Sequence, residues 1–192
     1  MKPLALKDII SLEAYEKERQ EMRRRIIALK AVRRVHVGPR VSMVFENRET
    51  MRFQVQEMCR IEHIEDDHLI QQEIDCYNDL LPEGMAVGAT LLIELVQEDD
   101  MPTLLKELSG IEETVWMSFN GHQVKAQAEA GRSTEEKTSS VHYLTWRFDS
   151  PLRDALSTAC AVVLEIRHPH YEHEFTLDSK TVASLVQDLI GH

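Results

Sequence analysis

Val41 to Ile64, VSMVFENRETMRFQVQEMCRIEHI, is the stretch on which the fold of this 192-residue chain depends. Side chains alternate between the two faces of a strand, and apolar residues alternate with polar ones here. The apolar residues that would share a face are Val41, Met43 and Phe45, and then Met51, Phe53 and Val55. The pattern predicts a hairpin of two strands, Val41–Glu46 and Met51–Val55, around Asn47 to Thr50. A helix is predicted to follow over Gln56–Ile64.

Polar side chains run through this stretch at unusual density, which indicates either an internal hydrogen-bond network or a recognition surface. Arginine suits recognition because its guanidinium pairs with carboxylate or phosphate through two hydrogen bonds. Catalysis by this group is a lesser alternative. The candidate partner- or ligand-binding residues, taken from here and from the first helix, are Glu46, Asn47, Arg48, Arg52, Gln54, Glu57, Arg60, Arg23 and Arg24.

Upstream of this stretch, apolar residues at helical spacing predict a helix from Leu6 to about Val32, which Gly38 and Pro39 end. Downstream, the sequence predicts further helices over Asp67–Leu81, Pro102–Leu108, Pro151–Ala159 and Ser179–Ile190. Strands are predicted over Gly88–Val96, Thr114–Phe119, His122–Ala128, Val141–Phe148 and Ala161–Arg167. Asn120-Gly121 is a strong hairpin signal, and the polar segment Glu129–Ser139 is predicted to be a mobile loop.

Helices come first in this order, and strands with two hairpins follow. That order favours an α+β fold with a mostly antiparallel sheet, N-terminal helices and a C-terminal helix. We find no linker or repeat, so residues 1–192 are expected to form a single domain. Within it, residues 1–36 hold a basic N-terminal helix and residues 41–64 hold the polar hairpin and helix.

The net charge of −11 is unevenly distributed along the chain. Residues 1–40 hold 11 Lys and Arg against 5 Asp and Glu, a net +6, so the remainder carries −17. A solvated helix face or a docking patch for an acidic protein explains the basic cluster, which is Arg23, Arg24, Arg25, Lys30, Arg33 and Arg34. No aromatic stacking platform accompanies these residues, which argues against nucleic acid as the partner.

Membrane and cofactor sites find no support in the sequence. No apolar run approaches the roughly 20 residues of a membrane helix, and the N-terminus lacks a signal-peptide core, so a cytoplasmic protein is expected. Cys59, Cys76 and Cys160 are far apart and form no CxxC pair, so we expect them to hold no iron–sulfur cluster or structural zinc, and we expect no cofactor in the chain.

The segment His168-Pro169-His170-Tyr171-Glu172-His173 leaves two interpretations open. His168 and His170 share a face in an extended chain, and His173 could complete a site for zinc or another transition metal. The alternative is a strand end, with Pro169 interrupting the ladder and the histidines in solvent.

With these residues in view, the sequence resembles a bacterial family of unknown function. The resemblance spans about residues 1–175 and rests on MKPLALKDI at the start, Val37-Gly38-Pro39, Val44-Phe45-Glu46-Asn47-Arg48, Thr50, Arg52-Phe53-Gln54, Gln56-Glu57-Met58, Arg60, Glu62, Tyr77-Asn78, Ala89-Thr90-Leu91, Val141–Phe148, His168-Pro169 and Tyr171. Genes of that family are commonly found beside rubrerythrin and an iron–sulfur protein related to heterodisulfide reductase. The resemblance therefore implies a role near peroxide defence or iron–sulfur electron transfer.

Together these observations predict a non-catalytic cytosolic accessory protein that binds a redox partner, either the iron–sulfur protein or rubrerythrin. The partner would dock on the Arg/Glu-rich hairpin and the first helix. The alternative is a metal- or small-ligand-binding protein, or an enzyme, that uses the His168–His173 cluster or the polar hairpin. A nucleic-acid-binding regulator ranks third, and homo-oligomerisation is left open.

Overall fold

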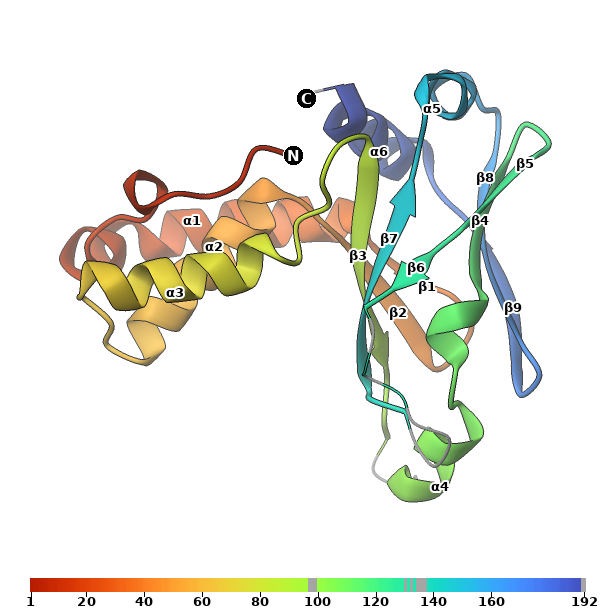
Figure 1. Cartoon of the computed structure of the whole chain (residues 1–192), viewed down its shortest axis with the longest axis horizontal. Helices are drawn as coiled ribbons and strands as arrows, with labels where there is room; N and C mark the ends of the chain where they lie inside the picture. The colour runs from red at the N-terminus through yellow and green to blue at the C-terminus, as the bar shows by residue number, and fades with distance from the viewer. Residues whose placement is uncertain (97–99, 130, 132, 134–137, 191–192) are drawn as a thin grey trace.

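The deciding stretch folds as a strand followed directly by a helix in the computed structural model (Figure 1). Strand β2 spans Val41–Glu46, as predicted, and helix α2 spans Arg48–Ile61. The predicted second strand, Met51–Val55, is therefore wrong, and with it the polar hairpin. The helix expected from Gln56 begins at Arg48 instead.

Capping explains why a helix forms here. The side chain of Asn47 accepts hydrogen bonds from the backbone N–H groups of Glu49 and Thr50, at 3.1 and 3.0 Å. The Thr50 hydroxyl in turn accepts one from the Asn47 N–H at 2.9 Å, which completes a capping box. Met51, Val55 and Cys59 then follow at four-residue spacing and are all buried. Five residues of alternation fit a strand equally well, but the cap and the longer period favour a helix.

The structure describes residues 1–96, 100–129, 131, 133 and 138–190. Helix α1 spans Leu12–Arg33 and begins at the Ser11 cap rather than at Leu6, because a separate 3₁₀ turn, η1 (Leu6–Asp8), precedes it. The remaining α-helices of the described chain are α3 (Asp67–Asn78), α4 (Met101–Glu107), α5 (Ser150–Ser157) and α6 (Ser179–Ile190). A second 3₁₀ turn, η2, spans Ile111–Thr114.

The described strands form two antiparallel sheets, which confirms the predicted α+β class. The five-stranded sheet has the order β1 (Arg34–His36), β2, β3 (Ala86–Ile93), β7 (Val141–Arg147) and β6 (Gln127–Ala128). The four-stranded sheet has the order β5 (His122–Lys125), β4 (Val115–Phe119), β8 (Val162–His168) and β9 (Tyr171–Thr176). The Asn120-Gly121 hairpin joins β4 to β5, with both turn residues at positive φ.

Strands β1 and β9 were not predicted, and part of the predicted loop cannot be compared. Pro169 and His170 turn the chain so that Tyr171 pairs with His168, which places the histidine-rich segment on a hairpin. The predicted mobile loop, Glu129–Ser139, lies partly outside the described residues.

Two separate apolar clusters divide the molecule into a sandwich and a helical arm. The sandwich consists of the two sheets with α4, α5 and α6, and its core is buried between the sheets. The helical arm consists of η1, α1, α2 and α3, and it projects to one side of the sandwich (Figure 1). A smaller cluster that includes Leu4, Met51, Val55, Cys59 and Ile74 holds the arm together.

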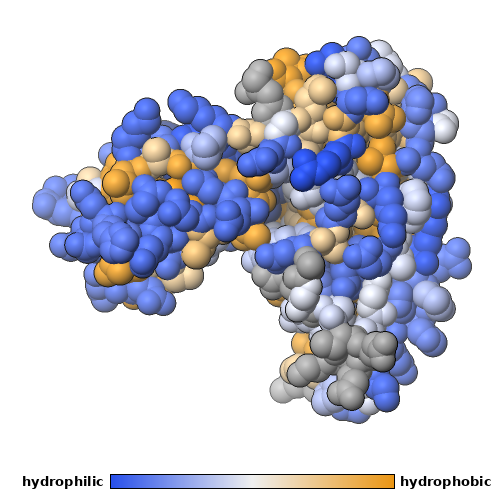
Figure 2. Space-filling model, in the orientation of Figure 1, coloured by the Kyte–Doolittle hydropathy of each residue, from blue (hydrophilic) through white to orange (hydrophobic). Residues whose placement is uncertain are grey.

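Hydrophobic residues also gather on the surface along the helical arm and beside α5 and α6, edged by hydrophilic ones (Figure 2). No helix in the described ranges combines the length and the apolar character needed to cross a membrane.

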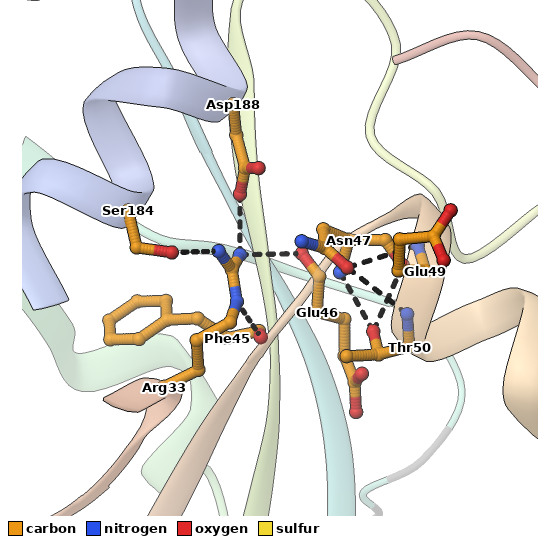
Figure 3. A network of polar contacts seen from close by, with 8 residues as sticks. All are labelled: Arg33, Phe45, Glu46, Asn47, Glu49, Thr50, Ser184 and Asp188. Carbon is orange, nitrogen blue, oxygen red and sulfur yellow. Dashed lines mark hydrogen bonds and ion pairs between the residues drawn. The ribbon is translucent and has the colours of Figure 1, made fainter. Parts of the chain in front are cut away.

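One buried arginine ties the helical arm to the sandwich (Figure 3). Arg33, the last residue of α1, is completely buried. Its guanidinium donates to the carbonyls of Phe45 and Glu46 at 2.7 and 3.2 Å. It also donates to the Ser184 hydroxyl at 2.6 Å and pairs with the Asp188 carboxylate, both on α6. A single side chain therefore joins α1, β2 and α6.

A tyrosine makes the equivalent connection between the two sheets. The Tyr171 hydroxyl, from β9, donates to the Val37 carbonyl at 2.7 Å and accepts from the N–H groups of Arg40 and Val41. It thus fills the turn between β1 and β2. Gly38 in that turn has φ of +76°, and a Cβ there would lie 2.6 Å from the Tyr171 hydroxyl. Glycine is required at this position on both counts.

We predict that Arg33→Met lowers the free energy of unfolding by about 3 kcal/mol or more. The substitution removes the buried guanidinium that pairs with Asp188 and donates to the carbonyls of Phe45 and Glu46. Arg34→Met is the matched control, because Arg34 is adjacent but exposed. Urea denaturation followed by circular dichroism measures both variants. Equal unfolding midpoints for the two would contradict the role assigned to Arg33.

Candidate functional site

The seam between α1 and α2 is organised around the Glu57 carboxylate. Arg19 donates to both of its oxygens, at 2.7 and 2.9 Å, in a bidentate pair. The Tyr15 hydroxyl donates at 2.6 Å, and Arg60 adds two longer contacts at 3.3 and 3.4 Å. Tyr15 is fully buried, so these bonds lie in a partly dry environment where they are strengthened.

These hydrogen bonds determine the protonation states of Glu57 and Tyr15. Hydrogen bonds from Arg19 above all, helped by Tyr15 and Arg60, lower the pKa of Glu57 from 4.5 to about 2. Burial and the neighbouring Glu57 carboxylate raise the pKa of the Tyr15 phenol. Both groups therefore keep one protonation state across the physiological range, which suits a structural role better than proton transfer.

Several other candidate residues hold the N-terminal segment in place. The side-chain amide of Gln56, which is buried, both donates to and accepts from the backbone of Ile10, at 2.9 and 3.0 Å. Arg48 pairs with Asp8, and its hydrogen bond lowers the pKa of that carboxyl. Asn47 is occupied as the cap of α2.

The remaining residues of the polar stretch do not gather into one surface. Arg52 contacts Glu49 at 3.4 Å, one turn away on the same helix. Gln54 makes only long contacts, to the Thr50 carbonyl at 3.5 Å and the Met51 sulfur at 3.6 Å. Glu46 points away from all of these, toward a cavity described below.

A groove along α1, α2 and β1 is the surface feature of this region that is open to a partner. Its volume is about 570 Å³, and its lining residues are Arg23, Ile26, Ile27, Lys30, Ala31, Arg34, His36, Phe53 and Glu57. Ile27 is 54% exposed although it is a large aliphatic residue. Only Arg23 and Glu57 among the predicted site residues line this groove.

Sequence reasoning placed Lys30 and Arg34 in the basic cluster but missed Ile27 and Phe53 as groove residues. Phe53 was assigned to the core face of a strand that does not exist. Ile27 carried a usable signal, since it lies off the apolar stripe of α1 and next to three consecutive arginines. Arg24, a predicted site residue, is exposed and pairs with Glu21 at 2.9 Å, outside the groove lining.

The three histidines of the predicted metal site do not converge on one point. His168 is buried, with Nε2 3.0 Å from the Ser109 carbonyl and Nδ1 accepting from the His170 N–H at 3.3 Å. Both ring nitrogens are thus used, and no lone pair is left for a metal ion. The His173 ring packs edge-on against Tyr171. Across the described ranges, no three His, Cys, Asp or Glu side chains are grouped to hold a metal.

One buried arrangement has the chemical composition of a hydrolase triad but not its proton pathway. The Thr138 hydroxyl lies 2.8 Å from Nε2 of His142, whose Nδ1 lies 3.9 Å from the Glu112 carboxylate. The same Nε2 lies 2.8 Å from the Ser139 carbonyl, which can only accept. Nε2 must therefore carry a hydrogen and cannot take the threonine proton.

The fold and the groove together define the class of protein: an α+β protein in which a helical arm with a cationic, partly apolar groove is joined to a two-sheet sandwich. The chain belongs to the DUF3501 family, described as a protein of unknown function, whose model matches residues 3–189. It is similar to the crystal structure of a novel protein of unknown function from Burkholderia pseudomallei, with 35% sequence identity and a TM-score of 0.89. That similarity covers 97% of this chain and 99% of the other. No curated protein matches the chain.

We predict that Glu57→Gln destabilises the protein at pH 7 by about 1–3 kcal/mol, because the Arg19 pair loses its anion. Folding lowers the pKa of Glu57, so its ionised carboxylate stabilises the folded state fully at pH values above the pKa of the unfolded chain, near 4.5. That stability is lost as the pH falls toward 2, so the difference between wild type and variant should narrow over this range. Glu62→Gln, an exposed position on the same helix end, is the control. Urea denaturation at stepped pH measures the difference, and a gap that does not change with pH would refute the assignment.

Proposed function

We propose that this protein is a non-catalytic binding protein whose groove on α1, α2 and β1 docks an acidic protein partner. The observation that carries the proposal is the exposed Ile27 at the centre of a rim of cations. Apolar anchors surrounded by charge are the usual composition of a specific protein interface.

Charge in the groove supports an acidic occupant. Arg23, Lys30 and Arg34 line it, whereas the one lining carboxylate, Glu57, is already neutralised by Arg19 and Arg60. The rest of the chain carries a strong negative charge. A partner with acidic residues around an apolar side chain would be drawn to this groove and repelled elsewhere, which fixes its orientation.

The sequence resemblance supports a choice of partner for this proposal. It implies rubrerythrin or the iron–sulfur protein related to heterodisulfide reductase, whose genes would lie beside that of this chain. An accessory role needs no bound cofactor in this chain. Its three cysteines are unpaired by disulfides, with Cys59 buried and Cys76 and Cys160 exposed. The redox chemistry would therefore belong to the partner.

We predict that Arg23→Glu slows association with the true partner by about threefold to tenfold at low salt and flattens its salt dependence. Arg25→Glu is the matched control. It makes the same change of charge on the same helix, but Arg25 does not line the groove. The measurement is biolayer interferometry with each candidate partner, purified with its cofactor from the same host. If both variants slow association equally, the groove is not the docking site.

A second pair of variants tests the apolar anchor. Ile27→Ser should weaken the equilibrium affinity by about tenfold, as expected for loss of a central interface anchor. Leu69→Ser is its control, because Leu69 is exposed on α3, away from the groove. If neither purified candidate binds the wild-type protein saturably, the proposed redox partnership is wrong.

A further inference from the structure

Glu46 is a buried carboxylate that the protein leaves half satisfied. It ends β2, where Phe45 faces the core between the sheets and Glu46 faces the opposite side. Figure 3 shows its side chain directed away from the Arg33 guanidinium, which binds only its carbonyl. Glu46 is 4% exposed. Its Oε1 accepts from the Thr90 hydroxyl at 3.2 Å, while Oε2 is buried and has no hydrogen-bond partner among the described residues.

An unsatisfied carboxylate oxygen at this depth is costly. Leaving a buried charged acceptor without a donor costs several kcal/mol in general, and proteins keep such groups where they serve a function. One hydroxyl at 3.2 Å is weak compensation beside the three donor side chains that surround Glu57. Within the described part of the chain, no arginine or lysine donates to Oε2, so a donor from outside the chain would complete the site.

A cavity of about 230 Å³ opens beside this carboxylate, at the corner where the helical arm meets β3, β6 and β7 (Figure 1). Its apolar wall is formed by the side chains of the buried Met51 and the partly buried Leu80, beside Glu46. Tyr143 and Thr145 of β7 add hydroxyl groups, and the exposed carboxylate of Asp79 also lines it. The cavity therefore has an anionic group at its buried end, an apolar wall, and two exposed acidic residues, Asp79 and Glu129, on its open side.

We propose that this cavity binds a short linear diamine. One ammonium group donates to Oε2 of Glu46, the methylene chain packs against Met51 and Leu80, and the second ammonium lies near Asp79. An ammonium has three donors, so the hydroxyls of Tyr143 and Thr145 can accept those that Glu46 does not. Charge-assisted hydrogen bonds to a buried carboxylate are among the stronger polar contacts.

Other classes of ligand fit the cavity less well. Among the described residues that line the cavity, the one cation, Arg147, donates to Gln127 at 3.0 Å, whereas Glu46, Asp79 and Glu129 are acidic, so an anion would be repelled. A metal ion would need several converging ligands, and none of the groups in the described chain supplies three. The volume is below that of pockets for drug-sized molecules, which restricts the occupant to a small one.

The test is isothermal titration of the purified full chain with 1,4-diaminobutane at physiological salt. We expect saturable binding of one diamine per chain, at least tenfold weaker binding to Glu46→Gln, and binding to Glu49→Gln equal to that of the wild type. Glu49 is the matched control, since it is an exposed carboxylate three residues away that does not line the cavity. Neutral 1,4-butanediol should not bind. The absence of saturable diamine binding would overturn the proposal, as would equal weakening by the two variants, which would indicate attraction by net charge alone.

A second variant keeps the test independent of the folding of Glu46→Gln. Thr145→Leu places a larger side chain in the cavity from β7 and leaves residue 46 as glutamate. This variant should also weaken diamine binding at least tenfold. Asp79→Asn should weaken 1,4-diaminobutane but leave 1-aminobutane unchanged, because only the diamine reaches the exposed carboxylate. Full diamine affinity in Thr145→Leu would place binding elsewhere on the protein and defeat the proposal.

Discussion

The arrangement of the whole chain depends on the buried guanidinium of Arg33. A guanidinium cannot be buried unless its donors are met, and here the acceptors come from two other elements, β2 and α6. Two are carbonyls at the end of β2, and the others belong to Ser184 and Asp188 on α6. Because Arg33 is the last residue of α1, meeting these acceptors also fixes where the helical arm leaves the sandwich. The groove and the cavity both lie on elements whose positions this contact determines.

The sequence predicts those elements whose signal is local. Asn120-Gly121 specifies its own turn, the apolar run of β3 indicates a strand covered on both faces, and α6 shows a clear helical period. The start of α2 was missed because a short alternation of apolar residues is compatible with both helix and strand. Arg33 could not be recognised at all, since Ser184 and Asp188 lie 151 and 155 residues away and two acceptors are backbone carbonyls.

The polar residues of Val41–Ile64 have different roles, which the sequence alone cannot distinguish. Once α2 is a helix, neighbours in sequence point in different directions. Gln56 binds the N-terminal segment, Glu57 faces α1, and Glu46, just before the cap, faces a cavity. Glu46 and Glu57 are both glutamates, but their surroundings differ. Three donor side chains surround the Glu57 carboxylate, whereas the Glu46 carboxylate accepts a single weak hydrogen bond. Residue identity therefore located a polar region, and only the fold shows that Glu57 is fully paired whereas Glu46 faces a cavity.

The division into two apolar cores has a consequence for how the protein opens. The sandwich core is large and includes Phe45 and Trp146, whereas the core of the helical arm is small and lies beneath exposed aliphatic residues such as Ile27 and Ile61. Cooperative units in proteins follow contiguous cores, and smaller ones open at lower free energy. Backbone amides of α2 and α3 should thus exchange with solvent through partial opening while β3 and β7 remain closed. The helical arm is in this sense a separate foldon, attached to a more persistent one.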